Sequence, residues 1–175
     1  MQIERVDETH LRPSDDALIN TLLMRAFGED FGNRSFHQQR HTLRLLTRQN
    51  ERVIGHMALC YRAVRLGNTL HNIMGLAEVA TDPEFRGQGV ANRLLAAAIV
   101  EAKTTQAAFF LLFGDQPLYA TGGFRAFPNP ITYVDYDHAR TGSVHHVVLD
   151  QLMVLPLHKT PWDDTATLDL LGHKF

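Results

Sequence analysis

The stretch FRGQGVAN, residues 85–92, combines residue types that can hold an anion through the protein backbone. Gly87 and Gly89 stand one residue apart, with Arg86 before them and the small Ala91 after them, between a strand-like run and a helix-like run. The first N–H groups of a helix have no partner inside the helix and lie at the positive end of its dipole. Because glycine has no side chain, a phosphate can approach such groups closely. The sequence therefore predicts a phosphate site at the start of this helix.

Two common phosphate-binding patterns do not fit this stretch. A P-loop requires G-x-x-x-x-G-K-[ST], and no such string occurs in the sequence. A dinucleotide fingerprint requires G-x-G-x-x-G or A, but Asn92 stands at its third position and antiparallel strands are predicted before it. For the two glycines taken alone, a simple loop with glycine caps is the alternative interpretation.

Helices on either side of this stretch are predicted from apolar residues at helical spacing. One covers 13–27, with Pro13 in its first turn and Gly28 after its last turn. The second covers 90–103 and begins at the glycine-rich stretch. A short helix over 116–122 ends at a pair of glycines.

The strands are predicted from apolar and β-branched runs bounded by turn residues. They cover 2–6, 41–49, 53–66, 69–82, 107–114, 131–136 and 145–157. Residues 29–40 are expected to be a loop or a short helix, and the tail from 158 is expected to be irregular. The order predicts a mixed α/β fold with one partly antiparallel sheet, and 175 residues suit a single domain over 1–175.

Composition excludes several classes of function. The net charge is −2, which gives no electrostatic footprint for nucleic acid or an anionic membrane. No apolar run approaches 18 residues, and the first residues lack the apolar core of a signal peptide. One cysteine fits a reducing compartment, so a cytoplasmic location is expected.

The segment VATDPEFRGQGVANRLL resembles motif A of the GNAT superfamily, the acyl-CoA-dependent N-acetyltransferases. The motif runs from a strand through x-x-P-x-[FY]-[RQ]-x-x-G-x-[GA] into a helix. The matching residues are Pro83, Phe85, Arg86, Gly89 and Ala91. A second family signature, a tyrosine four or five residues before Gly-Phe, is similar to PLYATGGF. Together the two motifs make residues 53–127 resemble the family.

The resemblance implies a GNAT fold and acetyl-CoA as co-substrate. This fold is a mixed, mostly antiparallel central sheet of six to seven strands flanked by helices, with a splayed strand pair that holds the cofactor. The pantetheine arm would pair with the end of the preceding strand at Val79, Ala80 and Thr81. The pyrophosphate would lie on the N–H groups of the turn, at Arg86, Gly87, Gln88, Gly89, Val90 and Ala91.

The resemblance also implies direct attack of a primary amine, on a small molecule or peptide, on the thioester. Tyr119 matches the residue that protonates the departing thiolate, since a phenol with a pKa of about 10 is protonated at neutral pH; core packing is the alternative role. Transfer of a longer acyl chain and a non-catalytic acyl-CoA-binding sensor are alternatives to the activity as a whole. No metal is expected, and a homodimer is left open.

Glu78 is the candidate general base, because it is the one carboxylate in the apolar run GLAEVA. Burial would raise the pKa of its carboxyl group toward a useful range, whereas pairing with an arginine is the other interpretation. His56 and Cys60 share one face of a strand, and His71 is a further candidate for the same groove. Each is more simply a packing residue, and Cys60 is expected to pack rather than to act as a nucleophile.

The sequence departs from the family pattern in two places. Many relatives carry an asparagine early in the second motif, but here LLFGDQPLY resembles a bacterial subgroup with G-D-x-x-Y-Y, and Leu118 replaces one aromatic residue. The tail is similar in layout to those of aminoglycoside 2'-N-acetyltransferases and rhizobial nodulation acyltransferases. That similarity implies a tail over the acceptor groove, with Trp162, Asp163 or Asp164 near a cationic substrate; alternatively, Trp162 covers an apolar edge.

Overall fold

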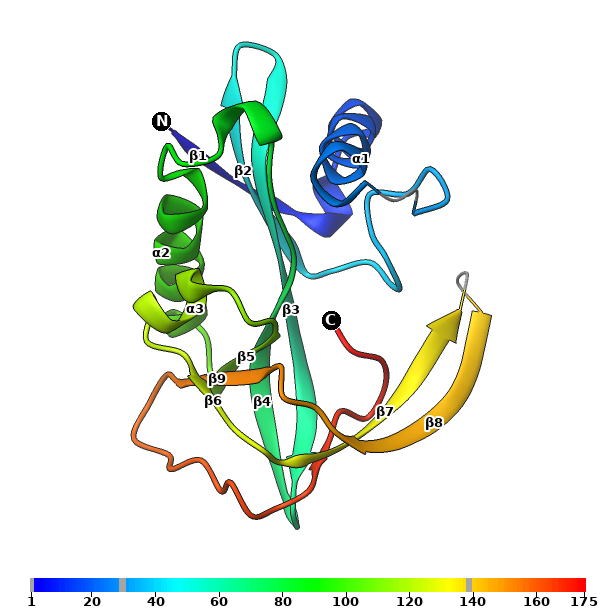
Figure 1. The fold of residues 1–175 in the computed structure, drawn as a ribbon, viewed down its shortest axis with the longest axis vertical. Coiled ribbons are helices and arrows are strands. Elements are labelled where there is room, and N and C mark those ends of the chain that lie inside the picture. Colours follow the sequence, from blue (N-terminus) through cyan, green and yellow to red (C-terminus); the bar gives the residue numbers. More distant parts are fainter. Residues whose placement is uncertain (1, 29–30, 138–139) are drawn as a thin grey trace.

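The computed structural model describes residues 2–28, 31–137 and 140–175, which form one curved sheet with helices on both faces (Figure 1). The helices are α1 (Pro13–Phe27), α2 (Val90–Lys103) and α3 (Pro117–Thr121), with short 3-10 turns at Glu8–His10 and Pro83–Phe85. The strands are β1 (Ile3–Asp7), β2 (Leu43–Gln49), β3 (Arg52–Leu66), β4 (Thr69–Thr81), β5 (Phe109–Phe113), β6 (Arg125–Ala126), β7 (Pro130–Asp137), β8 (Arg140–Val148), β9 (Leu152–Pro156) and β10 (Leu168–Asp169). No helix in the described residues is long and apolar enough to cross a membrane.

The strands lie in the order β6-β9-β5-β4-β3-β10-β7-β8, and β1 and β2 extend the sheet from the other part of β3. The pairs β4–β5 and β10–β7 are parallel and the other pairs are antiparallel. The prediction of a mixed, mostly antiparallel sheet in an α/β fold is therefore confirmed. Successive residues of a strand face opposite sides, so Leu45 packs in the core under α2 whereas Leu46 packs in the core under α1.

Both long helices begin and end where the sequence predicted. Gly28 ends α1 in the left-handed conformation, at φ 71°, and its N–H donates to the carbonyl of Met24. α2 buries Leu94, Leu95, Ala98 and Ala102 against the sheet. α2 therefore fixes the position of the glycine turn before it, because its apolar face cannot shift along the sheet without losing this packing.

The C-terminal third differs from the prediction. The run at 145–157 is two strands, β8 and β9, divided at 149–151, and β8 begins at Arg140. β8 pairs with β7 alone and is largely exposed, whereas β9 lies between β5 and β6 and is mostly buried. The tail was expected to be irregular, but β10 pairs with both β3 and β7. These strands and β6 bring the described sheet to ten strands.

β4 is the element that positions the site. Its pairing with β5 covers Ile73 to Leu76 and ends there, while its pairing with β3 continues to Thr81. On the β3 side, Ala77 pairs with Ala58 and Ala80 pairs with His56, so two residues of β4 face one residue of β3. This is a β-bulge. β4 thus continues past β5 as an edge, toward the start of α2 (Figure 1).

Candidate functional site

Asp82 fixes the conformation of the turn between β4 and α2. Its carboxylate accepts the N–H of Glu84 at 3.1 Å and pairs with Arg25 at 3.2 Å and Arg52 at 2.5 Å. Gly87 and Gly89 both have left-handed backbone conformations, with φ of 75° and 76°. A Cβ atom on either glycine would meet nothing within 4 Å, so both face open space. The turn is therefore a fixed loop with an unobstructed surface.

The backbone N–H groups of this turn are available to a ligand. Across the described residues, no acceptor is found for the N–H groups of Gly87, Gln88, Gly89, Val90 and Ala91. α2 has no side-chain N-cap and no acidic residue in its first turn. The start of α2 therefore carries unsatisfied donors and the positive end of a dipole, which fit a phosphate or diphosphate.

The side chains of the turn point to other partners. The guanidinium of Arg86 donates to the carbonyl oxygen of Ala26, at the C-terminal end of α1, at 3.1 Å. The side-chain amide of Gln88 donates to the carbonyl oxygen of Glu84 at 3.2 Å. The turn therefore offers an anion mainly its backbone, because the side chain of Arg86 is held at the end of α1.

The strand end at Val79, Ala80 and Thr81 leads directly into this turn. Ala80 is buried under α1, and Val79 packs at the margin of the core under α2. Because the pairing of β5 with β4 ends at Leu76, this stretch of β4 has no strand partner on the β5 side among the described residues. An extended ligand with amide groups can pair with such an edge as an added strand does.

Glu78 lies in the bulge with a backbone φ of 48°, and its side chain is 7% exposed. One carboxylate oxygen accepts the backbone N–H of His37 at 2.6 Å, and the other lies 2.9 Å from Nε2 of His41. Burial raises the pKa of this carboxyl group, but the hydrogen bond and charge of His41 outweigh burial and leave the pKa below its ordinary value. The expectation of a net rise in this pKa, toward the range of a general base, is therefore wrong. The nearest arginine nitrogen, on Arg44, is 3.8 Å away, so the main partner is a histidine.

His41 lies between Glu78 and Cys60 and contacts both. The sequence did not predict this role of His41. Its Nδ1 lies 3.1 Å from Sγ of Cys60, while Nε2 faces Glu78. Burial lowers the pKa of the ring, but the hydrogen bonds and charges of Cys60 and Glu78 raise it by more, so that the pKa is about 9. The pairing of Leu43 with Leu59 brings His41, just before β2, beside Cys60 on β3. No local pattern around residue 41 signals this contact.

His56 supports the β-bulge through a hydrogen bond to its backbone. Its Nδ1–H donates to the backbone carbonyl of Glu78 at 2.8 Å, and its Nε2 accepts from Arg44 at 3.2 Å. Burial and then the charge of Arg44 lower the pKa of His56 to about 3, so the ring is neutral. Arg44 is fully buried and also donates to Glu8 and to the carbonyl of Ser35. His56 therefore positions Glu78 through the backbone.

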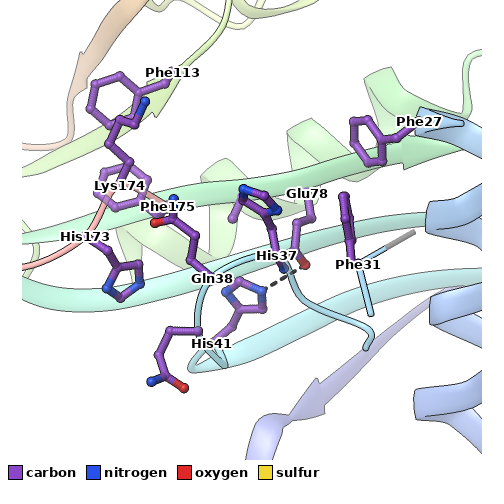
Figure 2. Close-up of a pocket in the computed structure, with 12 residues that line it drawn as sticks. Phe27, Phe31, His37, Gln38, His41, Glu78, Phe113, His173, Lys174 and Phe175 are labelled. Atoms are coloured by element: carbon purple, nitrogen blue, oxygen red, sulfur yellow. Dashed lines mark hydrogen bonds and ion pairs between the residues drawn. The ribbon is translucent and has the colours of Figure 1, made fainter. Parts of the chain in front are cut away.

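A cavity of about 270 Å³ lies next to the bulge. Figure 2 shows Glu78 and His41 joined at its centre, between two groups of aromatic side chains. These side chains are Phe27 and Phe31 on one side and Phe113 and Phe175 on the other. The cavity therefore places an apolar, aromatic enclosure beside a buried carboxylate.

Tyr119 lies on α3 and is buried in the core under α2, where its ring meets Phe124 edge-on at 6.4 Å. Burial and then the charge of Asp115 raise the pKa of its phenol, so the hydroxyl stays protonated at neutral pH. The ring lies so close to Gly114 that a Cβ there would approach it to 2.8 Å. Tyr119 does not line the cavity beside Glu78, and its role as an acid stays a prediction.

Two other expected groove residues lie elsewhere. His71 and Trp162 both pack edge-on against Phe109, at 5.2 and 5.0 Å, and Nε1 of Trp162 donates to Asn129 at 2.9 Å. Trp162 thus covers an apolar edge, the second of its two interpretations. The part of the tail that lines the cavity is its end, at 173–175. Within the described residues, no group of three or more His, Cys, Asp or Glu side chains is arranged to hold a metal ion.

The sequence model of the acetyltransferase (GNAT) domain matches residues 10–127. No curated protein matches the chain.

Solved structures share the fold at low identity. A GNAT family acetyltransferase from Brucella melitensis, in complex with acetyl-CoA, is 20% identical with a TM-score of 0.62, over 95% of this chain and 94% of that one. The N-acetyltransferase YhbS from Escherichia coli, in complex with CoA, is 22% identical with a TM-score of 0.65, over 96% and 88%. The ribosomal-protein-S18-alanine N-acetyltransferase from Escherichia coli is 17% identical with a TM-score of 0.59, over 91% and 97%.

Proposed function

The chain belongs to the GNAT acetyltransferase superfamily, and we propose that it transfers the acetyl group of acetyl-CoA to a primary amine by direct attack of that amine. The observation that carries this proposal is the open edge of β4, which leads into a turn of unsatisfied backbone N–H groups at the start of α2. The sheet is continuous from β1 to β10, which supports a single domain over 1–175.

Acetyl-CoA fits the two halves of this surface. The N–H groups from Gly87 to Ala91 are suited to the diphosphate, because they combine free donors with a helix dipole. The backbone of Val79, Ala80 and Thr81 is suited to the amides of the pantetheine arm. The related structures from Brucella melitensis and Escherichia coli hold acetyl-CoA and CoA, which supports this co-substrate for the chain.

The reacting groups are assigned to Tyr119 and Glu78. Tyr119 is the proton donor for the leaving thiolate, since its raised pKa keeps the phenol protonated. Glu78 is the proton acceptor for the amine, since its carboxylate faces the cavity. Its lowered pKa makes it a weak base, so it contributes less to the rate than Tyr119 and acts more by attracting a cationic amine.

The acceptor is a small-molecule amine with an apolar body. A cavity of about 270 Å³ admits a small molecule or a single side chain, and its aromatic walls match an apolar group more closely than a highly charged one. We place this activity in the cytoplasm, in keeping with the composition of the chain.

Calorimetry and an amine panel test this function. Acetyl-CoA should bind the protein and raise its Tm, because a ligand that binds only the folded state stabilises it. Release of free CoA thiol should then depend on both acetyl-CoA and one of the amines. Binding without turnover across a broad panel would favour a sensor, faster turnover with longer acyl-CoA would favour an acyltransferase, and absence of binding would contradict the proposal.

A further inference from the structure

We propose that Cys60 is a second reactive group of this site, a thiol nucleophile that takes the acetyl group from acetyl-CoA and forms a covalent acyl-enzyme. His41 would act as its base, and Glu78 would position His41. This inference rests on the proposed binding of acetyl-CoA beside β4. It adds a covalent route to the direct transfer described above.

The three side chains have the geometry of an activated nucleophile. Nδ1 of His41 lies 3.1 Å from Sγ of Cys60, and Nε2 lies 2.9 Å from the carboxylate of Glu78. Because Nε2–H donates a hydrogen bond to the carboxylate, Nδ1 faces the thiol and can hold the proton that Sγ gives up. A nucleophile next to a base that a third group orients is the arrangement that activates cysteine in acyl-transfer enzymes.

Other contacts fix the third member in place. Glu78 is held by the N–H of His37 at 2.6 Å and, through its backbone carbonyl, by His56 at 2.8 Å. The side chains of His41 and Glu78 are only 4% and 7% exposed, so water competes little for their hydrogen bond. The imidazole therefore has a defined orientation toward Cys60.

Two cationic side chains lie beside the thiol. The ring of His41 is in contact with it, and the half-buried guanidinium of Arg62 lies close enough to interact with it electrostatically. Nε of Arg62 has no hydrogen-bond partner among the described residues, while a terminal nitrogen of its guanidinium donates to the carbonyl oxygen of His173. Cysteines beside cationic groups are more reactive than those in apolar cores.

The aromatic ring of Phe175 lies between the thiol and the cavity. Cys60 is 8% exposed and packs with Ala58, Ala77 and Phe175. Ala77 and Phe175 both line the cavity, so Cys60 lies directly behind its wall. The ring of Phe175 packs against Gly75. The guanidinium carbon of Arg62 lies 4.7 Å from the centroid of this ring, in a cation–π contact. Movement of this ring would join the thiol to the cavity.

The chemical step is a thioester exchange that needs no further reactant. The proton shared by Sγ of Cys60 and Nδ1 of His41 stays on the histidine while Sγ attacks the thioester carbonyl carbon. A new C–S bond to Cys60 forms as the C–S bond to coenzyme A breaks. Coenzyme A leaves as a thiolate and takes up the proton from His41. The acyl-enzyme then passes the acetyl group to an amine, which restores the thiol.

Two measurements without any amine test the proposal. The full-length protein is incubated with acetyl-CoA, and the peptide that contains Cys60 is examined for the mass of one acetyl group. In parallel, labelled CoA is mixed with unlabelled acetyl-CoA, and exchange of the label is followed. Both signals are expected in the wild type and absent in Cys60→Ala; direct transfer alone gives neither.

The base is tested with a matched pair of histidine variants. His41→Gln should slow both signals by roughly tenfold or more, since general-base assistance of this kind contributes at least that much. His71→Gln is the control, because His71 packs against Phe109 and does not line the cavity. Phe175→Ala should instead speed acetylation of Cys60 by opening the path to it.

Alkylation with iodoacetamide supplies a readout that is independent of acetyl-CoA. Cys60 in the wild type should react roughly tenfold faster than in His41→Gln at neutral pH, whether or not Cys60→Ala proves stable. If acetyl-CoA binds by calorimetry but Cys60 gains no acetyl group and no label exchanges, the inference is overturned while the proposed function stands. If acetyl-CoA does not bind, the proposed function itself fails.

Discussion

In the turn at 86–91, the groups offered to a ligand are backbone N–H groups, whereas in the cluster around Glu78 they are side chains. Residues 86–88 of the turn are exposed, and its two glycines face open space. The cluster of Glu78, His41 and Cys60 is buried and draws on β3, β4 and the segment before β2. The turn can therefore bind a phosphate on almost any molecule, whereas the cluster can act only while its three side chains keep their positions.

The two regions also differ in how they bear on stability. Removing one member of a buried charged pair leaves the other without compensation, at a cost of about 3–5 kcal/mol. His41 and Glu78 form such a pair. The turn has no comparable pair among its ligand-binding groups, so a change there should affect binding far more than folding. This contrast can be tested with single substitutions in each region.

The largest expected effect is the loss of acetyl-CoA binding in Gly89→Glu. The new side chain would enter the open space at the start of α2, and its carboxylate would repel a phosphate. The Kd should rise by roughly 1000-fold or more, which corresponds to about 4 kcal/mol. Isothermal titration calorimetry measures the Kd. The free energy of unfolding should fall only by the cost of a non-glycine residue at φ 76°, about 1–2 kcal/mol.

Gly89→Ala is the matched control for this substitution. It imposes the same backbone strain without a charge or a long side chain, so its Kd should stay within about tenfold of the wild type. An equal loss of binding in both variants would show that strain, rather than occupation of the phosphate site, explains the effect.

The second prediction concerns the pH dependence of stability in the cluster. The pKa of His41 is raised to about 9 in the folded protein, from 6.5 in the unfolded chain. Its contribution is therefore fully present below pH 6.5 and is lost as the pH rises through about 9. The full contribution is at most about 3 kcal/mol. The free-energy difference between wild type and His41→Gln, from urea unfolding, should shrink by about this amount over that range.

His173→Gln is the control for a histidine at the cavity. Burial and then the charge of Arg62 lower the pKa of His173 to about 4, so above pH 6.5 its difference from the wild type should stay nearly constant. A constant difference for His41→Gln as well would mean that the ring is neutral in the folded protein.

Local signals made part of the fold predictable from sequence. Pro13 and Gly28 mark the ends of α1, and the glycines before Val90 mark the start of α2, so both helices were predicted with the observed bounds. The phosphate-binding turn was predictable for the same reason, because its residues are contiguous. In contrast, β8 and β9 were predicted as one strand, although the polar pair at 150–151 interrupts the apolar run.

The cluster was only partly predictable because it depends on contacts that are distant in sequence. Glu78 stood out as a carboxylate in an apolar run. His41 did not, because its role follows from the register of β2 on β3 and not from its neighbours in sequence. The direction of the Glu78 pKa shift was wrong for the same reason: burial was foreseen, but the histidine that outweighs it was not.

The third prediction is a loss of turnover in Tyr119→Phe. The ring and its packing in the core remain, and only the phenolic hydroxyl is removed. The kcat should fall by at least about tenfold, while KM for acetyl-CoA should change little, since a proton donor to the thiolate acts mainly in the transition state. Steady-state kinetics with an accepted amine measures both constants. A wild-type kcat would assign Tyr119 to packing alone and leave protonation to water or to another group.

The smallest expected effect is that of Arg86→Gln, which separates the contribution of the turn's backbone from that of the cationic side chain within it. The guanidinium of Arg86 already donates to the carbonyl of Ala26 at the negative end of α1, so it is not free to contact a phosphate closely. Its remaining attraction through solvent is screened by salt over about 10 Å. The Kd for acetyl-CoA should therefore rise by less than about threefold, well under 1 kcal/mol, against a much larger loss in Gly89→Glu. Titrations at low and at physiological ionic strength measure this difference, which should be greater at low ionic strength. A loss of affinity for acetyl-CoA above about tenfold at physiological ionic strength would show that Arg86 leaves α1 and binds the diphosphate. Binding at the turn would then depend on a side chain, like the cluster around Glu78.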